Sequence, residues 1–313
     1  MRLIAAFLKL IRLPNLIFIL LTQLLFHFSI LHRVLKPLGL QPAINGMNFV
    51  LLAVASVLIA AAGYIINDYF DINIDQVNKP RQNVVDVAIS RRWAMLWHFI
   101  LSSAGVVLSL WLSWQTGLWY IVLANTLCVM LLFGYSVALK RKLLSGNVLI
   151  SLLTAWVILV LCFSEWHLFK NATTELVEAS NKILRLGFLY AGFAFILSLI
   201  REAIKDMEDV PGDVKYGSKT MPIVWGIQAT KIYSAVWLVV LVAALVIVQF
   251  YVLQFHWWWP VVYSIGCIIA PLVYVFIKLF KAHAPPQFHH LSNITKLVMF
   301  TGILSMLFFY YYL

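Results

Sequence analysis

The sequence has very few charged residues. Only 11% of its 313 residues are Asp, Glu, Lys or Arg, whereas a soluble globular domain carries about 25%. This scarcity excludes an ordinary soluble domain, and the 63% of hydrophobic residues, gathered in long runs, indicates an integral membrane protein. Each span must satisfy its own backbone hydrogen bonds in lipid, and the runs are longer than the strands of an outer-membrane barrel. We therefore expect an all-α membrane protein.

Cysteine is also scarce. Cys128, Cys162 and Cys267 lie in three separate apolar runs, which is typical of small buried hydrophobic residues. This spacing argues against a disulfide framework or a thiolate metal site. No small-residue cleavage site follows the first apolar run, so we expect no cleavable signal peptide.

Nine apolar segments are long enough to cross a membrane. They cover residues 15–31, 49–66, 93–112, 118–139, 148–163, 186–200, 232–251, 261–279 and 297–313, after a short amphipathic helix in residues 1–15. Most of the 23 Lys and Arg residues fall in the connections on the side of the N-terminus. This asymmetry predicts a cytoplasmic N-terminus and a C-terminus on the opposite side, in a prokaryotic inner membrane.

The net charge of +11 does not require nucleic acid as a partner. No basic run is interleaved with a soluble fold, as a nucleic-acid-binding domain would have. Basic residues at the ends of spans orient the helices and contact anionic lipid headgroups. We therefore expect membrane lipid, and no nucleic acid, at the basic surface.

Half of the 12 acidic residues form two matching aspartate triads, which lie in the motifs of residues 67–81 and 201–219. Both motifs follow an apolar run, both are expected to be cytoplasmic loops, and both have the spacing D-x-x-D-x-x-x-D. Their members are Asp68, Asp71 and Asp75 in the first motif and Asp206, Asp209 and Asp213 in the second. Like charges repel unless a cation compensates them, and Mg²⁺ takes oxygen ligands that it often shares with phosphate. Two facing triads therefore predict two Mg²⁺ ions that hold a diphosphate.

Basic side chains accompany both motifs. Lys79, Lys205 and Lys219 lie within them, Arg201 lies at the end of a span, and Lys140 belongs to a third connection on the same side. Ionisable residues at such positions are often functional, and cations beside carboxylates favour a phosphate cradle. We expect these side chains to bind the phosphate oxygens that the metal ions leave free.

These motifs resemble those of UbiA-type intramembrane prenyltransferases. Residues 67–79 are similar to the family signature N-D-x-x-D-x-x-x-D, and residues 206–219 are similar to its second acidic motif. Tyr135, Lys140 and Asn147 are similar to the tyrosine, lysine and asparagine of the segment between them, and Arg12 with Asn15 is similar to the N-terminal signature. The resemblance implies one domain, residues 1–313, in which nine transmembrane helices surround a central cavity. Two four-helix units would each carry one acidic loop, with a ninth helix added.

The resemblance also implies a metal-dependent prenyltransferase that uses a prenyl diphosphate donor and a lipophilic acceptor, without an obligatory protein partner. Residues 201–226 are most similar to the geranylgeranylglyceryl-phosphate geranylgeranyltransferases, which make ether lipids. Residues 81–87 depart from the usual family sequence, so an aromatic quinone precursor stays open as the alternative acceptor. The six aspartates and Asn67 are the implied metal ligands. The implied substrate-binding residues are Arg12, Asn15, Asn67, Lys79, Tyr135, Lys140, Asn147, Arg201, Lys205 and Lys219.

Two other classes of protein also place polar groups in a helical bundle. A secondary transporter has its carboxylates near the bilayer midplane on broken helices, whereas here they follow the ends of spans. A non-catalytic lipid-binding protein has no evident need for six aspartates. We therefore favour an enzyme over both alternatives.

Overall fold

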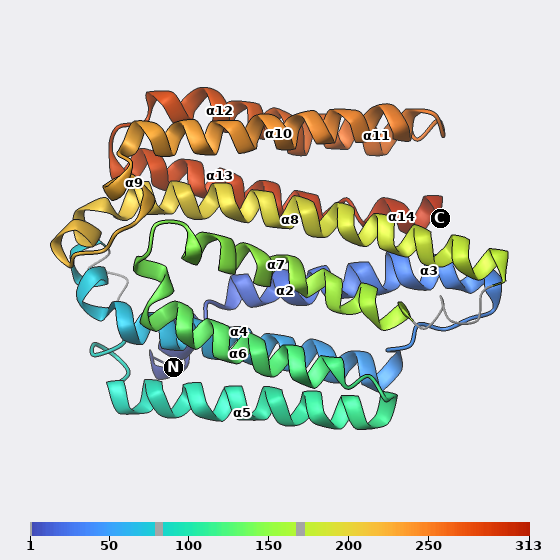
Figure 1. The fold of residues 1–313 in the computed structure, drawn as a ribbon, viewed down its shortest axis with the longest axis horizontal. Coiled ribbons are helices and arrows are strands. Elements are labelled where there is room, and N and C mark those ends of the chain that lie inside the picture. Colours follow the sequence, from blue (N-terminus) through green and yellow to red (C-terminus); the bar gives the residue numbers. More distant parts are fainter. Residues whose placement is uncertain (1, 79–83, 167–172) are drawn as a thin grey trace.

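The computed structural model describes residues 2–78, 84–166 and 173–313, and it is a bundle of long helices that run side by side (Figure 1). Nine spans within these residues are long and apolar enough to cross a membrane. The first runs over Leu13–Leu38 and the eighth over Trp258–Lys281, each interrupted by a short π-helical segment, and the ninth covers Pro285–Tyr312. The other six are α4 (Gly46–Asn78), α5 (Arg91–Thr116), α6 (Tyr120–Val137), α7 (Ser145–Ser164), α8 (Thr174–Lys215) and α10 (Ile227–Leu253). The prediction of nine membrane-spanning helices is confirmed.

Two of these helices are much longer than a membrane requires. α4 has 33 residues and α8 has 42, whereas about 20 residues cross the hydrocarbon core. Their extra turns carry the acidic motifs, so the prediction of acidic loops is wrong for residues 67–78 and 201–215. The loss of apolar residues after each run suggested a loop, but the aspartate spacing of three and four suits a helix equally well.

The N-terminal segment forms the expected short helix, α1 (Arg2–Leu10). The proline at position 14 predicts a break there, but the chain breaks at Arg12 instead. Arg12, with φ 52° and ψ 54°, adopts the left-handed conformation that ends this segment, which is uncommon for a residue other than glycine. Pro14 lies in the first turn of α2 (Leu13–Leu25) instead, where its missing N–H group is tolerated. The sharp turn of the chain between α1 and α2 therefore lies at Arg12.

Helices α7 and α8 approach each other very closely. A Cβ atom added at Gly187 of α8 would lie 1.8 Å from the Sγ atom of Cys162 on α7. Cys162 is buried among apolar side chains, as expected for a small hydrophobic residue. This contact fixes the lateral position of α8, which carries the second acidic motif.

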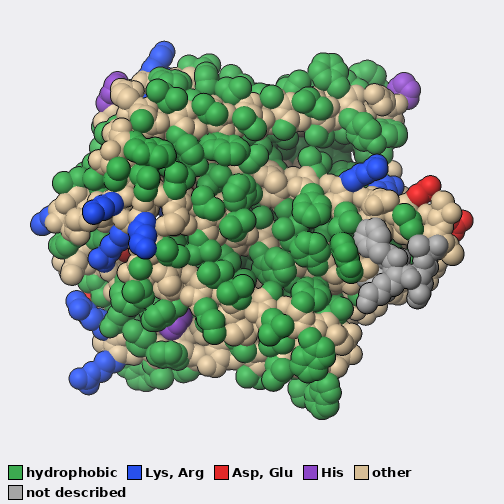
Figure 2. Space-filling view, in the orientation of Figure 1, with side chains coloured by type: hydrophobic (Ala, Val, Ile, Leu, Met, Phe, Trp, Pro, Cys, Tyr) green, Lys and Arg blue, Asp and Glu red, His purple; other side chains and the backbone are tan. Residues whose placement is uncertain are grey.

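One end of the bundle collects the segments of interest. In Figure 1 the N-terminus, the last turns of α4 and α8 and the turn η3 (Leu139–Arg141) lie at the same end, and the C-terminus lies at the other. Lys and Arg side chains gather toward that end on the face shown in Figure 2. The division into two four-helix units plus a ninth helix stays a prediction.

A methyl group at the α7–α8 contact should destabilise the fold. Gly187→Ala places an atom where Cys162 already lies, and overpacking of this kind costs about 1–3 kcal/mol. We expect its thermal unfolding in detergent, followed by circular dichroism, to occur several degrees below that of the wild type. Gly192→Ala is the matched control, because the space beside Gly192 on the same helix is open. Equal midpoints for the two variants would contradict the packing argument.

Candidate active site

The two acidic helix ends are joined by the side chain of Asn78. Its Nδ2 atom donates a hydrogen bond to the backbone oxygen of Asp209 at 3.0 Å, and its Oδ1 atom accepts one from the Gly212 N–H at 2.8 Å. A side chain at Gly212 would clash with Asn78, since a Cβ atom there would lie 2.6 Å from it. The last residue of α4 is therefore docked against the middle of the second motif on α8.

The first motif is neutralised by cations from other segments. Asp71 is buried, accepts a hydrogen bond from Asn67 Nδ2 at 2.7 Å and forms an ion pair with Lys140 of η3. Asp68 Oδ1 forms an ion pair with Arg12 Nη2 at 2.6 Å. Burial alone would lower the pKa of Lys140, but the interactions with Asp71, Tyr135 and Asp75 together outweigh this effect and raise that pKa. Lys140 therefore keeps its positive charge.

The second motif is held by hydrogen bonds from two other segments. Asp206 accepts a hydrogen bond from Asn147 Nδ2 of α7 at 2.8 Å. Asp213 accepts one from the Thr220 hydroxyl at 3.3 Å. Thr220 follows the end of α8 and lies beside the short helix α9 (Met221–Val224). These contacts fix two carboxylates that the sequence proposes as metal ligands.

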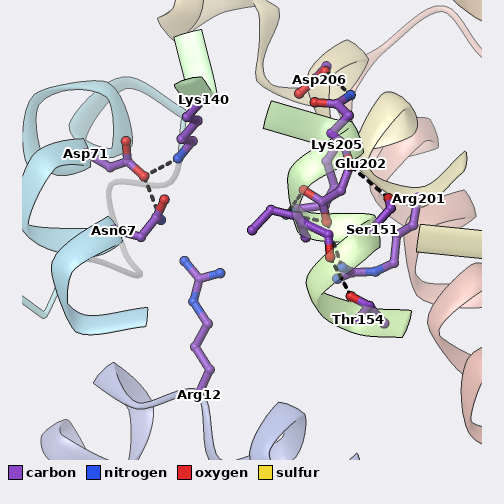
Figure 3. A network of polar contacts seen from close by, with 12 residues as sticks. Arg12, Asn67, Asp71, Lys140, Ser151, Thr154, Arg201, Glu202, Lys205 and Asp206 are labelled. Atoms are coloured by element: carbon purple, nitrogen blue, oxygen red, sulfur yellow. Dashed lines mark hydrogen bonds and ion pairs between the residues drawn. The ribbon is translucent and has the colours of Figure 1, made fainter. Parts of the chain in front are cut away.

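Both motifs meet around Lys140. This lysine interacts electrostatically with Asp71 and Asp75 of the first motif, and Asp213 of the second motif interacts with Lys140 and Asp71. Asp209 in turn interacts with Asp213. In Figure 3, Asn67, Asp71 and Lys140 lie on one side of an open space and Asp206 lies on the other. Aspartates of both motifs therefore lie within electrostatic range of one lysine, and the two facing metal sites stay a prediction.

A group of basic residues and one carboxylate lie on the α8 side of this space. Arg201 Nη1 and Lys205 Nζ both contact Glu202, at 3.2 Å and 3.0 Å. Arg12 extends into the space between this group and the Asn67–Asp71 group (Figure 3). Glu202, which was not among the predicted site residues, is buried and pairs with two predicted phosphate ligands.

The other predicted substrate-binding residues do not all lie at the site. The Asn15 side chain lies beside the Tyr64 hydroxyl, and Tyr135 lies within electrostatic range of Lys140 and Asp206. The Lys219 side chain is exposed, although its backbone N–H donates to the Arg141 oxygen at 2.8 Å. Lys79 lies outside the described residues. Asn78 was not among the predicted site residues, because a single amide side chain after the acidic motif does not indicate a contact with a distant helix.

The donor atoms at this site suit magnesium. Within the described residues, no three His, Cys, Asp or Glu side chains already surround one point, since Arg12 and Lys140 hold two of the carboxylates. Asn67 Oδ1, however, is buried and has no hydrogen-bond partner in the described part of the chain, which is a costly arrangement. A hard cation would satisfy this oxygen, and an all-oxygen donor set is the one that Mg²⁺ prefers.

An apolar hollow lies in the middle of the bundle. Its lining comes from α2, α7, α8 and α13 (Pro285–Leu304), and it encloses about 540 Å³ of atom-free space, its open side included. Thr154 of α7 belongs both to this lining and to the polar network of Figure 3. The hollow therefore lies next to the polar network along α7, and its apolar lining suits a hydrocarbon chain.

Residues 38–310 match the sequence model of the UbiA prenyltransferase family. The chain belongs to the UbiA prenyltransferase family. It is accordingly an integral, multi-pass membrane protein and an enzyme of the prenyltransferase class, as the sequence predicted. It is 28% identical to digeranylgeranylglyceryl phosphate synthase of Methanosphaera stadtmanae over 246 residues, which cover 78% of this chain and 81% of that protein.

Two solved structures have the same fold. A structure described as digeranylgeranylglyceryl phosphate synthase in membranes has a TM-score of 0.65 and 23% identity, with 100% of both chains covered. A UbiA homologue of Archaeoglobus fulgidus bound to DMAPP and Mg²⁺ has a TM-score of 0.55 and 17% identity, covering 96% of this chain and 98% of that one. At these identities the likeness concerns the fold, and it confirms the predicted helical bundle.

Removing the Asn78 side chain should slow prenyl transfer. Asn78→Ala loses two hydrogen bonds between the motifs, each worth about 1 kcal/mol, and lets the helix ends separate. We expect an initial rate about tenfold below the wild type, because misplaced ligands affect rate strongly. The exposed neighbour Gln76 provides the control variant Gln76→Ala. Similar rates for both variants would show that the Asn78 contacts do not position the site.

Proposed function

We propose that this UbiA-family enzyme transfers a geranylgeranyl group from geranylgeranyl diphosphate to the free hydroxyl of geranylgeranylglyceryl phosphate, which forms an ether lipid. The observation that carries the proposal is that aspartates of both triads interact with Lys140, in a bundle that also encloses an apolar hollow. The relative named digeranylgeranylglyceryl phosphate synthase supports this choice of acceptor. The A. fulgidus homologue, which binds DMAPP and Mg²⁺, supports the metal and the donor class.

The proposed metal ligands are the carboxylates of both helix ends, and we propose two ions. Asn67 with Asp68, Asp71 and Asp75 would hold one, and Asp206, Asp209 and Asp213 would hold the other. Bound Mg²⁺ neutralises the charge that grows on the diphosphate while the allylic carbon–oxygen bond breaks. Lys140 and Arg12 already place positive charge at the first motif, so both are proposed to contact the remaining phosphate oxygens.

The apolar hollow is proposed to hold the prenyl tail and keep water from the reactive carbon. An allylic cation is captured by any nearby nucleophile, so water has to be excluded for transfer to win over hydrolysis. The ring faces of Tyr64 and Tyr135, which lie beside the charged groups, are suited to stabilise positive charge. The acceptor hydroxyl oxygen then bonds to the prenyl carbon, its proton is released and diphosphate leaves.

We further propose that the N-terminus and this site face the cytoplasm, with the C-terminus on the opposite side. The gathering of Lys and Arg side chains at the end of the bundle that carries the site supports this orientation (Figure 2). We propose that residues 1–313 act as one domain without a protein partner.

The acceptor is tested by incubating the purified enzyme with geranylgeranyl diphosphate, Mg²⁺ and either geranylgeranylglyceryl phosphate or an aromatic quinone precursor. We expect mass spectrometry to detect the doubly prenylated glyceryl phosphate. A product formed only with the aromatic acceptor would replace this proposal with the quinone alternative.

Loss of one carboxylate from either motif should abolish turnover. Asp71→Ala and Asp209→Ala each remove a proposed metal ligand, and we expect diphosphate release to fall by about a hundredfold or more. Asp86→Ala is the control, since Asp86 is exposed and pairs with Arg91 away from these motifs. If both variants kept the rate of the control, the two motifs would not form the reaction centre.

Removal of divalent cations should also stop the reaction. We expect EDTA to eliminate diphosphate release and excess Mg²⁺ to restore it, because the carboxylates cannot bind a diphosphate without cations between them. Dialysed enzyme titrated with Mg²⁺ gives the measurement. Full activity in the presence of EDTA would contradict the proposed role of both motifs.

A further inference from the structure

Lys296 lies beside the site, although it belongs to neither acidic motif. It is a partly buried residue of α13, and its Nζ atom lies 5.4 Å from the centroid of the Phe18 ring. Phe18 lines the central hollow, as does Met299, which shares a helix face with Lys296 because the two are three residues apart. Lys296 therefore lies where the hollow meets the polar network.

Four cations from three separate parts of the chain come together here. Lys296 interacts electrostatically with Arg201 and Lys205 of α8 and with Arg12 at the corner before α2. Like charges are not expected to gather in a partly buried place unless an anion compensates them. The cluster therefore indicates an anion that binds beside the hollow.

Two carboxylates form ion pairs with three of these cations, and neither of them pairs with Lys296. Glu202 is shared by Arg201 and Lys205, and Asp68 pairs with Arg12. Lys296 forms no ion pair with any described residue, and Arg201 Nε is buried without a hydrogen-bond partner in the same part of the chain. A free donor and a free cation on neighbouring helices are the two groups that a phosphate oxygen would satisfy.

This cluster differs in position from the groups proposed to hold the diphosphate. Lys140 and Asp71 lie across the open space from Arg201, and Arg12 extends between the two sides (Figure 3). Lys140 and the Asn67–Asp71 metal ligands lie on the first side, and Asp206 of the second motif lies near the Arg201 group (Figure 3). The cations of the Arg201 group are therefore the ones available for a second anionic group.

We infer that Lys296 and Arg201 form a phosphate subsite that selects an acceptor lipid with a phosphate monoester head. This inference rests on the proposed function and identifies how that acceptor is recognised. A phosphate monoester carries a charge of about −1.5 to −2 near pH 7, so it offsets the uncompensated cations, whereas the corresponding neutral glycerol ether does not. The acceptor tail lies in the hollow or in the adjoining lipid.

The test compares two acceptors that differ only in the phosphate. Geranylgeranylglyceryl phosphate and geranylgeranylglycerol are each used with saturating geranylgeranyl diphosphate, and kcat/KM is measured for the wild type, Lys296→Met and Lys296→Arg. We expect Lys296→Met to lower the preference for the phosphorylated acceptor by about tenfold or more. Lys296→Arg should keep that preference, and the KM of the donor should be unchanged in both variants.

Lys278→Met is the matched control. Lys278 lies on α12 (Ala270–Lys281), and its Nζ atom is 5.7 Å from the Tyr274 ring, so the substitution removes a lysine with a similar aromatic contact away from the cluster. We expect this variant to keep the wild-type preference. Activity with geranylgeranylglycerol shows that each variant is folded, and Lys296→Gln replaces Lys296→Met if the latter unfolds.

The outcomes separate the inference from the proposed function. A wild type that uses neither acceptor contradicts the proposed function. If the wild type uses both acceptors and Lys296→Met keeps the same preference, the inference alone is overturned. A rise in the donor KM without a change in acceptor preference also overturns it, because Lys296 would then serve the diphosphate.

Discussion

The ion pair between Lys140 and Asp71 is the interaction on which the site depends. Asp71 is buried near the end of α4, and two further carboxylates, Asp75 on α4 and Asp213 on α8, lie within electrostatic range of the same lysine. Two unit charges 4 Å apart interact by about 4 kcal/mol at an effective dielectric constant of 20, so uncompensated acidic helix ends would repel each other strongly. Lys140, on the short turn between α6 and α7, therefore allows the two motifs to meet before any metal ion binds.

The acidic groups are positioned by helices, and this determines how rigid the site is. Because α4 and α8 continue without interruption through residues 67–78 and 201–215, each aspartate keeps the direction that its helix gives it. Asn78 then fixes one helix against the other through two hydrogen bonds. Sites built on helices hold their geometry more closely than sites on loops, which suits a reaction in which a diphosphate and an acceptor must be aligned.

Most of the architecture could be read from the sequence because lipid imposes simple constraints. The length of each apolar run predicted a helix, and the repeated aspartate spacing identified the two acidic motifs. The sequence did not show that the motifs are helical. The polar ends of α4 and α8 resemble loops because the apolar residues stop before them. Asn78 contacts residues that are 131 and 134 positions away, and nothing local marks such a contact. Lys296 counted only as one of the basic residues at a span end until the fold brought it beside Arg201.

The arrangement of cations also bears on how two anionic substrates can share one site. A diphosphate and a phosphate monoester repel each other, so their binding groups must be separated and yet bring the reacting atoms together. The structure has positive charge on both sides of the open space, with Lys140 on the α4 side and Arg201 on the α8 side (Figure 3). Arg12 lies between them because its left-handed backbone turns the chain sharply at that residue. A cation in this intermediate position is attracted to both anions and offsets part of their mutual repulsion, which gives the unusual conformation of Arg12 a physical reason.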